Sequence, residues 1–61
     1  MVDMGSLVGS IRRFGLVGPS YEVLGPAAAG ETGARMRIRL IESGEETDYA
    51  LAQLLADPEE D

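Results

Sequence analysis

The chain has 61 residues, 11 Asp and Glu residues against five Arg residues, a net charge of −6, and no Cys, His or Lys. This length allows one small domain, and the missing residue types exclude disulfide bridges and the usual Cys and His zinc sites. No run approaches the roughly 20 apolar residues of a membrane span, and the first residues lack the features of a signal peptide. We therefore expect a single domain over residues 1–61, in the cytoplasm.

Gly and Pro residues separate the predicted elements in the first half of the chain. Ser10–Phe14 combines β-branched and aromatic residues, which predicts a strand. The Gly-Pro step within residues 15–20 predicts a turn, and Tyr21–Leu24 is predicted as a second short strand. Gly25–Gly33 has no large apolar side chain to bury, so we expect a mobile loop there.

Ala34–Ile41 has the clearest pattern in the chain. Arginines at every second position alternate with Met36, Ile38 and Leu40, which is the period-2 pattern of a strand buried on one face. The apolar residues are expected to face the core. The arginines then form a row on the outer face, with successive side chains roughly 6.6 to 7 Å apart.

The Ser43-Gly44 step that follows this strand predicts a hairpin with a two-residue turn. Such a turn fixes the register of the two strands. Arg39 then faces Asp48 on the outer side of the sheet, and Ile38 faces Tyr49 on the core side. Charge pairing and hydrophobic pattern both favour this register.

The last part of the chain predicts a short helix. Ala50–Ala56 consists of good helix formers with leucines at spacing i, i+3 and i+4. Asp57-Pro58 should end the helix, because the residue before Pro is pushed out of the α region. The final Glu-Glu-Asp is expected to be a solvated acidic tail. Residues 1–5 and 58–61 are expected to be flexible.

Together these elements predict a mainly β domain, built as a small antiparallel sheet or an SH3-like partly open barrel with a short C-terminal helix. Its core should contain the apolar and aromatic residues on the inward faces of the predicted elements. They are Ile11, Phe14, Tyr21, Val23, Met36, Ile38, Leu40, Tyr49, Leu51, Leu54 and Leu55.

The residue types of the chain argue against catalysis. Thiol-imidazole pairs, Ser-His-Asp triads and Ser-Lys variants each need a residue that the sequence lacks. Carboxylates remain, but acid-base or metal chemistry needs a cleft, which a short hairpin does not provide. The spacing of the acids does not match an EF-hand, and Gly15–Gly18 lacks the Gly-Lys-Ser/Thr of a phosphate loop. We expect no enzyme activity, cofactor or metal.

Charge divides the chain into two unequal parts. Residues 1–41 carry five arginines against three acids, and residues 42–61 carry eight acids and no base, so the parts carry +2 and −8. An acidic surface of this kind suits a basic protein partner and repels a nucleic acid, and we expect no membrane partner. The candidate partner-binding residues are Glu42, Glu45, Glu46, Asp48, Asp57, Arg35, Arg37 and Arg39.

Four segments together resemble a short family of uncharacterised proteobacterial proteins, a domain of unknown function. They are Gly9–Gly15, Gly18–Val23, Glu42–Glu46 and Asp48–Pro58. The resemblance covers nearly the whole chain after Met4, and it implies no site residues.

Three functions remain open. The first is a non-catalytic protein-binding module, which resembles an antitoxin in size and charge and would neutralise a basic partner. The second is a nucleic-acid-binding small β-barrel, which requires all five arginines on one face. The third is a self-associating homodimer, because so short a chain has a marginal core and exposed strand edges.

Overall fold

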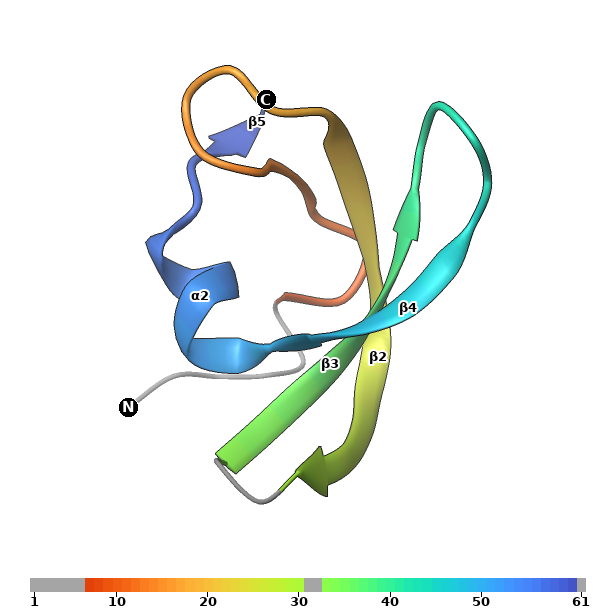
Figure 1. Ribbon diagram of the computed structural model, residues 1–61, viewed down its shortest axis with the longest axis vertical. Coiled ribbons are helices and arrows are strands. Elements are labelled where there is room, and N and C mark those ends of the chain that lie inside the picture. Colours follow the sequence, from red (N-terminus) through yellow and green to blue (C-terminus); the bar gives the residue numbers. More distant parts are fainter. Residues whose placement is uncertain (1–6, 31–32, 61) are drawn as a thin grey trace.

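The computed structural model describes residues 7–30 and 33–60. These residues form a five-stranded antiparallel sheet and one short helix (Figure 1). The elements are β1 (Ile11–Arg13), β2 (Ser20–Gly30), β3 (Gly33–Leu40), β4 (Glu46–Ala50), α2 (Leu51–Ala56) and β5 (Glu59–Glu60). The predicted fold class, a mainly β domain with a short helix near its C-terminal end, is confirmed.

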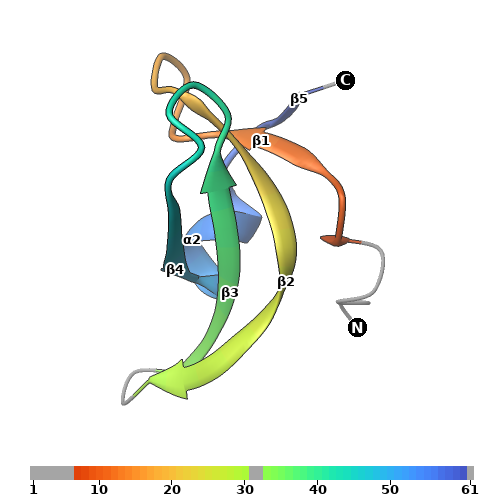
Figure 2. The same cartoon turned by 90° about the vertical axis from the view of Figure 1, so that its right-hand side faces the viewer.

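The sheet is open, with β4 and β5 at its two edges. The strand order is β4-β3-β2-β1-β5, and α2 lies between β4 and β5 in the sequence. The chain therefore passes from one edge of the sheet to the other through α2. Figures 1 and 2 show the long, twisted β2–β3 ladder with α2 to one side of it. Within the described ranges, no helix has the length and apolar character needed to cross a membrane.

The structure corrects the loop expected over Gly25–Gly33. β2 extends to Gly30 and β3 begins at Gly33, while residues 31–32 lie outside the described residues. Main-chain hydrogen bonds between strands need no large side chains, so small residues can continue a ladder that their neighbours have started. The pairing register of β2 with β3 shifts on both sides of the Gly25–Ala27 segment. These irregularities let the ladder include the segment.

The predicted register of the β3–β4 hairpin is also wrong. Arg39 pairs with Glu46, and Asp48 pairs with Arg37, because the connection between the strands is the five residues 41–45 and not a two-residue turn. A two-residue turn with Gly in second place needs positive φ at Ser43 as well. Only Gly44 has positive φ in this loop, at 75°. The error moves each partner by two residues, so both strands keep the faces that the pattern predicted.

The core lies between the inner face of the sheet and α2. Tyr21, Val23, Met36, Ile38 and Leu54 are fully buried, and Phe14, Leu40, Tyr49 and Leu51 pack against them. These nine predicted core residues are confirmed. Leu7 is a further buried residue, which the sequence did not indicate because it precedes the first predicted strand.

Two predicted core residues lie elsewhere. Ile11 pairs with Glu22 and Glu60 on the outer face, because β1 directs the neighbouring Arg12 inward instead. Leu55 is 41% exposed, because the six-residue helix buries only the residue before it. A helix this short turns a narrow stripe toward the sheet.

The C-terminal residues form more structure than expected. Helix α2 confirms the predicted helix, and the extended conformation of Asp57 ends it as the following proline predicts. Glu59 and Glu60 are not a solvated tail, because β5 pairs antiparallel with β1. Asp61 and the expected flexible residues 1–5 lie outside the described residues.

Candidate interaction surface

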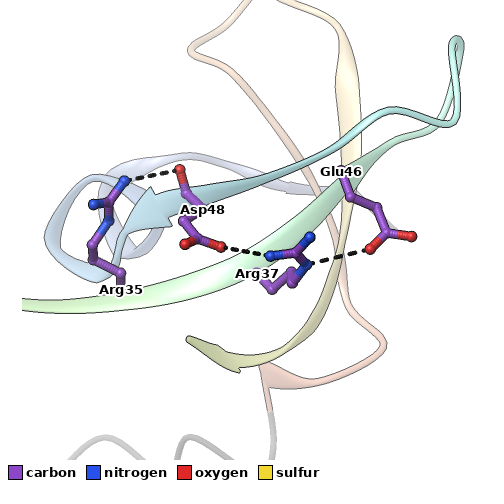
Figure 3. A network of polar contacts seen from close by, with 4 residues as sticks. All are labelled: Arg35, Arg37, Glu46 and Asp48. Carbon is purple, nitrogen blue, oxygen red and sulfur yellow. Dashed lines mark hydrogen bonds and ion pairs between the residues drawn. The ribbon is translucent and has the colours of Figure 1, made fainter. Parts of the chain in front are cut away.

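The outer face of the sheet carries the predicted row of arginines, and the row is charge-paired. Arg37 donates from Nε to Glu46 at 3.3 Å and from Nη1 to Asp48 at 3.2 Å (Figure 3). Arg35 donates to the backbone carbonyl of Asp48 at 3.5 Å, and Arg39 donates to Glu22 of β2 at 2.6 Å. These arginines are therefore occupied by acceptors on the neighbouring strands.

A second group of contacts continues the pairing across β1 and β5. Arg13 forms an ion pair with Glu60, whose other oxygen accepts a hydrogen bond from the Ser20 hydroxyl. These hydrogen bonds lower the pKa of the Glu60 carboxyl below its ordinary value. The outer face is thus close to neutral over its described part, and its exposed ion pairs add little stability.

Arg12 lies on the opposite face from the other arginines. It pairs with the buried Tyr21 across β1 and β2, and its Nη1 donates to the carbonyls of Leu54 and Asp57, each at 3.2 Å. This cation caps the C-terminal end of α2, where carbonyls lack helical partners. The five arginines therefore do not share a face, and the requirement of the nucleic-acid alternative is not met.

Asp57 is the acceptor for three elements of the fold. The Tyr21 and Tyr49 hydroxyls each donate to Oδ2 at 2.9 Å, and the Gly15 amide donates to Oδ1 at 3.3 Å. Phe14 packs against both tyrosine rings, with centroids 4.5 and 5.2 Å away. Burial and the adjacent carboxylate raise the pKa of both tyrosines. Asp57 thus has internal partners, although the sequence suggested it as a partner-binding residue.

The hairpin acids divide into two kinds. Glu46 and Asp48 are bound to Arg37, as described above. Glu42 and Glu45 lie in the connection between β3 and β4, are exposed, and form no ion pair or side-chain hydrogen bond with any described residue. The same holds for Glu59 of β5. We call Glu42, Glu45 and Glu59 the free carboxylates.

The free carboxylates belong to segments at one end of the molecule. Both views place the β3–β4 connection, the β1–β2 loop and β5 at this end (Figures 1 and 2). The Ile41 amide donates to the carbonyl of Ser20 at 3.1 Å, which joins the two connections at their base. We call this region the acidic end. It collects the surplus negative charge of the described residues.

The acidic end also exposes large apolar side chains that the sequence analysis did not single out. Leu16 is 83% exposed and Val17 is 97% exposed in the β1–β2 loop, and Ile41 is 49% exposed in the β3–β4 connection. Their signal in the sequence was an apolar pair inside a turn bounded by glycines. The prediction of a turn was correct, but the exposure of this pair depends on the loop conformation.

A shallow apolar hollow lies at the other side of the molecule, where α2 meets β3 and β4. Its volume is about 300 Å³, and its walls are Ala34, Ala50, Leu51, Ala52 and Leu55. These walls carry no titratable group. Among the described residues, no three acids lie close enough together to hold a metal ion.

The chain belongs to a family of unknown function, DUF5397, whose family model matches residues 2–61. This agrees with the resemblance to an uncharacterised domain. A comparison with curated proteins finds no match.

Proposed function

We propose that this domain is a non-catalytic protein-binding module that docks on a basic protein through its acidic end. The observation that carries the proposal is the separation of its acids. Glu22, Glu46, Asp48, Asp57 and Glu60 have partners inside the domain, whereas the free carboxylates point to no described partner. Charge without an internal partner is available for steering and orienting a partner of opposite charge.

The proposal narrows the predicted binding residues. Glu42 and Glu45 remain in the partner site, whereas Arg35, Arg37, Glu46 and Asp48 serve the β3–β4 ladder (Figure 3). If the surface that it covers is the active groove of the partner, binding neutralises that partner in the manner of an antitoxin. The bacterial cytoplasm is the compartment in which we place this interaction. The strand order and the helical turn before β5 support the SH3-like version of the fold.

The test is retention of proteins from a lysate of the source cells on immobilised domain, at low and at high salt, with quantitative mass spectrometry. We expect a basic protein that is retained at low salt and released at high salt. The double variant Glu42→Gln/Glu45→Gln should lose most of this retention. The control is Glu46→Gln/Asp48→Asn, which changes the net charge equally but on the ladder, and it should retain the protein.

Equal retention by both double variants would overturn the proposal. A wild-type column that holds only the domain itself, with a sedimentation mass of twice the monomer, would favour the homodimer instead. The open edge of β4 next to the apolar hollow is the surface on which such a dimer would form.

A further inference from the structure

The β1–β2 loop is closed by hydrogen bonds at its base. The Gly18 amide donates to the carbonyl of Phe14 at 2.9 Å, and the Phe14 amide donates to the carbonyl of Pro19 at 3.1 Å. Gly15 has φ of 65°, and its amide is fixed by Asp57. Two main-chain hydrogen bonds, both made by Phe14, thus close residues 15–18 into a loop at its base.

The base of the loop is anchored in the core. The Phe14 ring lies against Tyr21 and Tyr49, so its backbone is held where the loop begins. A Cβ added to Gly18 would lie 2.1 Å from the Phe14 carbonyl oxygen, which shows how tightly the chain closes on itself. A loop held in this way loses little conformational freedom when it binds.

This closed loop presents Leu16 and Val17 to solvent. At 83% and 97% exposed, their side chains contribute almost nothing to the core. Adjacent large apolar side chains that stay exposed on a folded domain are candidates for a protein interaction site. We call Leu16 and Val17 the apolar tip.

The charge around the apolar tip decides which occupant it suits. The free carboxylates belong to segments at the same end of the molecule (Figures 1 and 2). They would be repelled by the anionic lipids of a membrane surface. In a symmetric dimer through this end, they would face their own copies. A different protein with Lys or Arg around an apolar recess satisfies both the tip and the charges.

We propose that the apolar tip is the anchor of the interaction, inserting Leu16 and Val17 into an apolar recess of a protein whose rim is basic. This inference rests on the proposed function and assigns different roles to two groups of residues. The free carboxylates orient the partner and make binding salt-sensitive, whereas the tip supplies the affinity that remains when salt screens the charges.

The first test compares two variants on the lysate column. Leu16→Ser/Val17→Ser should lower retention of the basic protein at least tenfold at low salt, where the wild type retains it, and should lower the salt concentration at which the protein is released. The control Val8→Ser replaces another exposed aliphatic residue, at 46% exposure, and should retain the protein. Thermal unfolding should be unchanged in the tip variant, because neither side chain is buried.

The outcomes separate the two proposals. If Glu42→Gln/Glu45→Gln loses retention and the tip variant keeps it, the domain binds through charge and the anchor is refuted. If the tip variant loses retention and the charge variant keeps it, Leu16 and Val17 bind the partner without help from Glu42 and Glu45. The apolar anchor is then supported and the proposed function is refuted. If the wild-type domain retains no other protein, both are refuted.

A photo-crosslinker tests contact directly. Benzoylphenylalanine in place of Val17 should crosslink to the retained protein, whereas the same group in place of the exposed Ala28 on β2 should not. Crosslinking from position 28 alone would overturn the proposal. Crosslinking from position 17 only to a second copy of the domain would also overturn it. A third contradicting result is that the wild-type domain floats with vesicles of phosphatidylcholine and phosphatidylglycerol and the tip variant does not.

Discussion

The region around Asp57 and the acidic end use the same chemical group in opposite ways. At Asp57, one carboxylate accepts hydrogen bonds from two tyrosines and a loop amide, and so ties β2, β4 and the β1–β2 loop to the end of α2. At the acidic end, Glu42, Glu45 and Glu59 have no described partner. The difference teaches that the charge of a residue does not reveal its role. Its partners do.

The largest effect is expected where one carboxylate holds three elements. Asp57→Ala should lower the free energy of unfolding by about 3 kcal/mol, because it leaves the buried Tyr21 hydroxyl without an acceptor and removes charged hydrogen bonds. For so short a chain this is a large fraction of the total stability. Urea unfolding of the two proteins measures it. A loss below about 1 kcal/mol would show that the cluster does not hold the fold.

The next largest effect on stability is expected at Arg12, which binds main-chain carbonyls at the C-terminal end of α2. Arg12→Met keeps the aliphatic stem but removes two hydrogen bonds to the end of α2, which should lower stability by about 2 kcal/mol. Its Nε has no hydrogen-bond partner among the described residues, so removing that atom offsets part of the loss. The control Arg35→Met loses one long contact and should change stability by less than about 0.5 kcal/mol.

The tyrosines make stability fall in alkali. Their pKa values are raised in the folded state, so folding retains protons that the unfolded chain releases above about pH 10. Stability should therefore be constant from pH 8 to 9 and fall as the pH rises through 10 and 11. The chain has no Lys or Cys, so no other side chain titrates there. Tyr49→Phe should reduce stability at pH 8 by about 1 kcal/mol and flatten this decline.

A smaller effect is expected at Glu60, whose pKa is lowered by its bonds to Ser20 and Arg13. A lowered carboxyl pKa gives stability that is fully present above the unfolded value of about 4.3 and is lost as the pH falls through the lower folded value. Glu60→Gln should therefore be less stable than the wild type at pH 7 and equal to it near pH 2. A constant difference over this range would contradict the assignment.

The smallest effect on stability is expected at the acidic end. Glu42→Gln/Glu45→Gln removes no contact to a described residue, so its unfolding free energy should lie within about 0.5 kcal/mol of the wild type. The same variant should lose partner retention. Marked destabilisation would show that these carboxylates serve the fold after all, and the comparison between the two regions would fail.

The sequence predicted what depends on local patterns. The alternation in Ala34–Leu40 gave the buried face of β3, and the Asp57-Pro58 step gave the end of α2. Both follow from neighbours in the chain, since a strand alternates its faces and a proline excludes helix before it. The prediction of the β3–β4 register was wrong because it required a positive φ at Ser43, which that residue does not adopt.

The candidate site was harder to predict, because its division into bound and free carboxylates depends on contacts between distant residues. Asp57 meets Tyr21 across 36 positions of the sequence, and no local pattern marks that meeting. Glu42 and Asp48 look equally acidic in the sequence, yet only Asp48 faces an arginine on β3. Similarly, Leu16 and Val17 are residue types that are usually buried, and only the conformation of the loop shows that they are exposed.

Amide chemical shifts of the labelled domain, measured during titration with the protein that it retains, test the central claim most directly. We predict shifts over residues 15–18 and 41–45, with little change along Arg35, Arg37 and Arg39. Shifts centred on that arginine row or on the edge of β4, with both loops unchanged, would contradict the assignment of the acidic end as the binding surface.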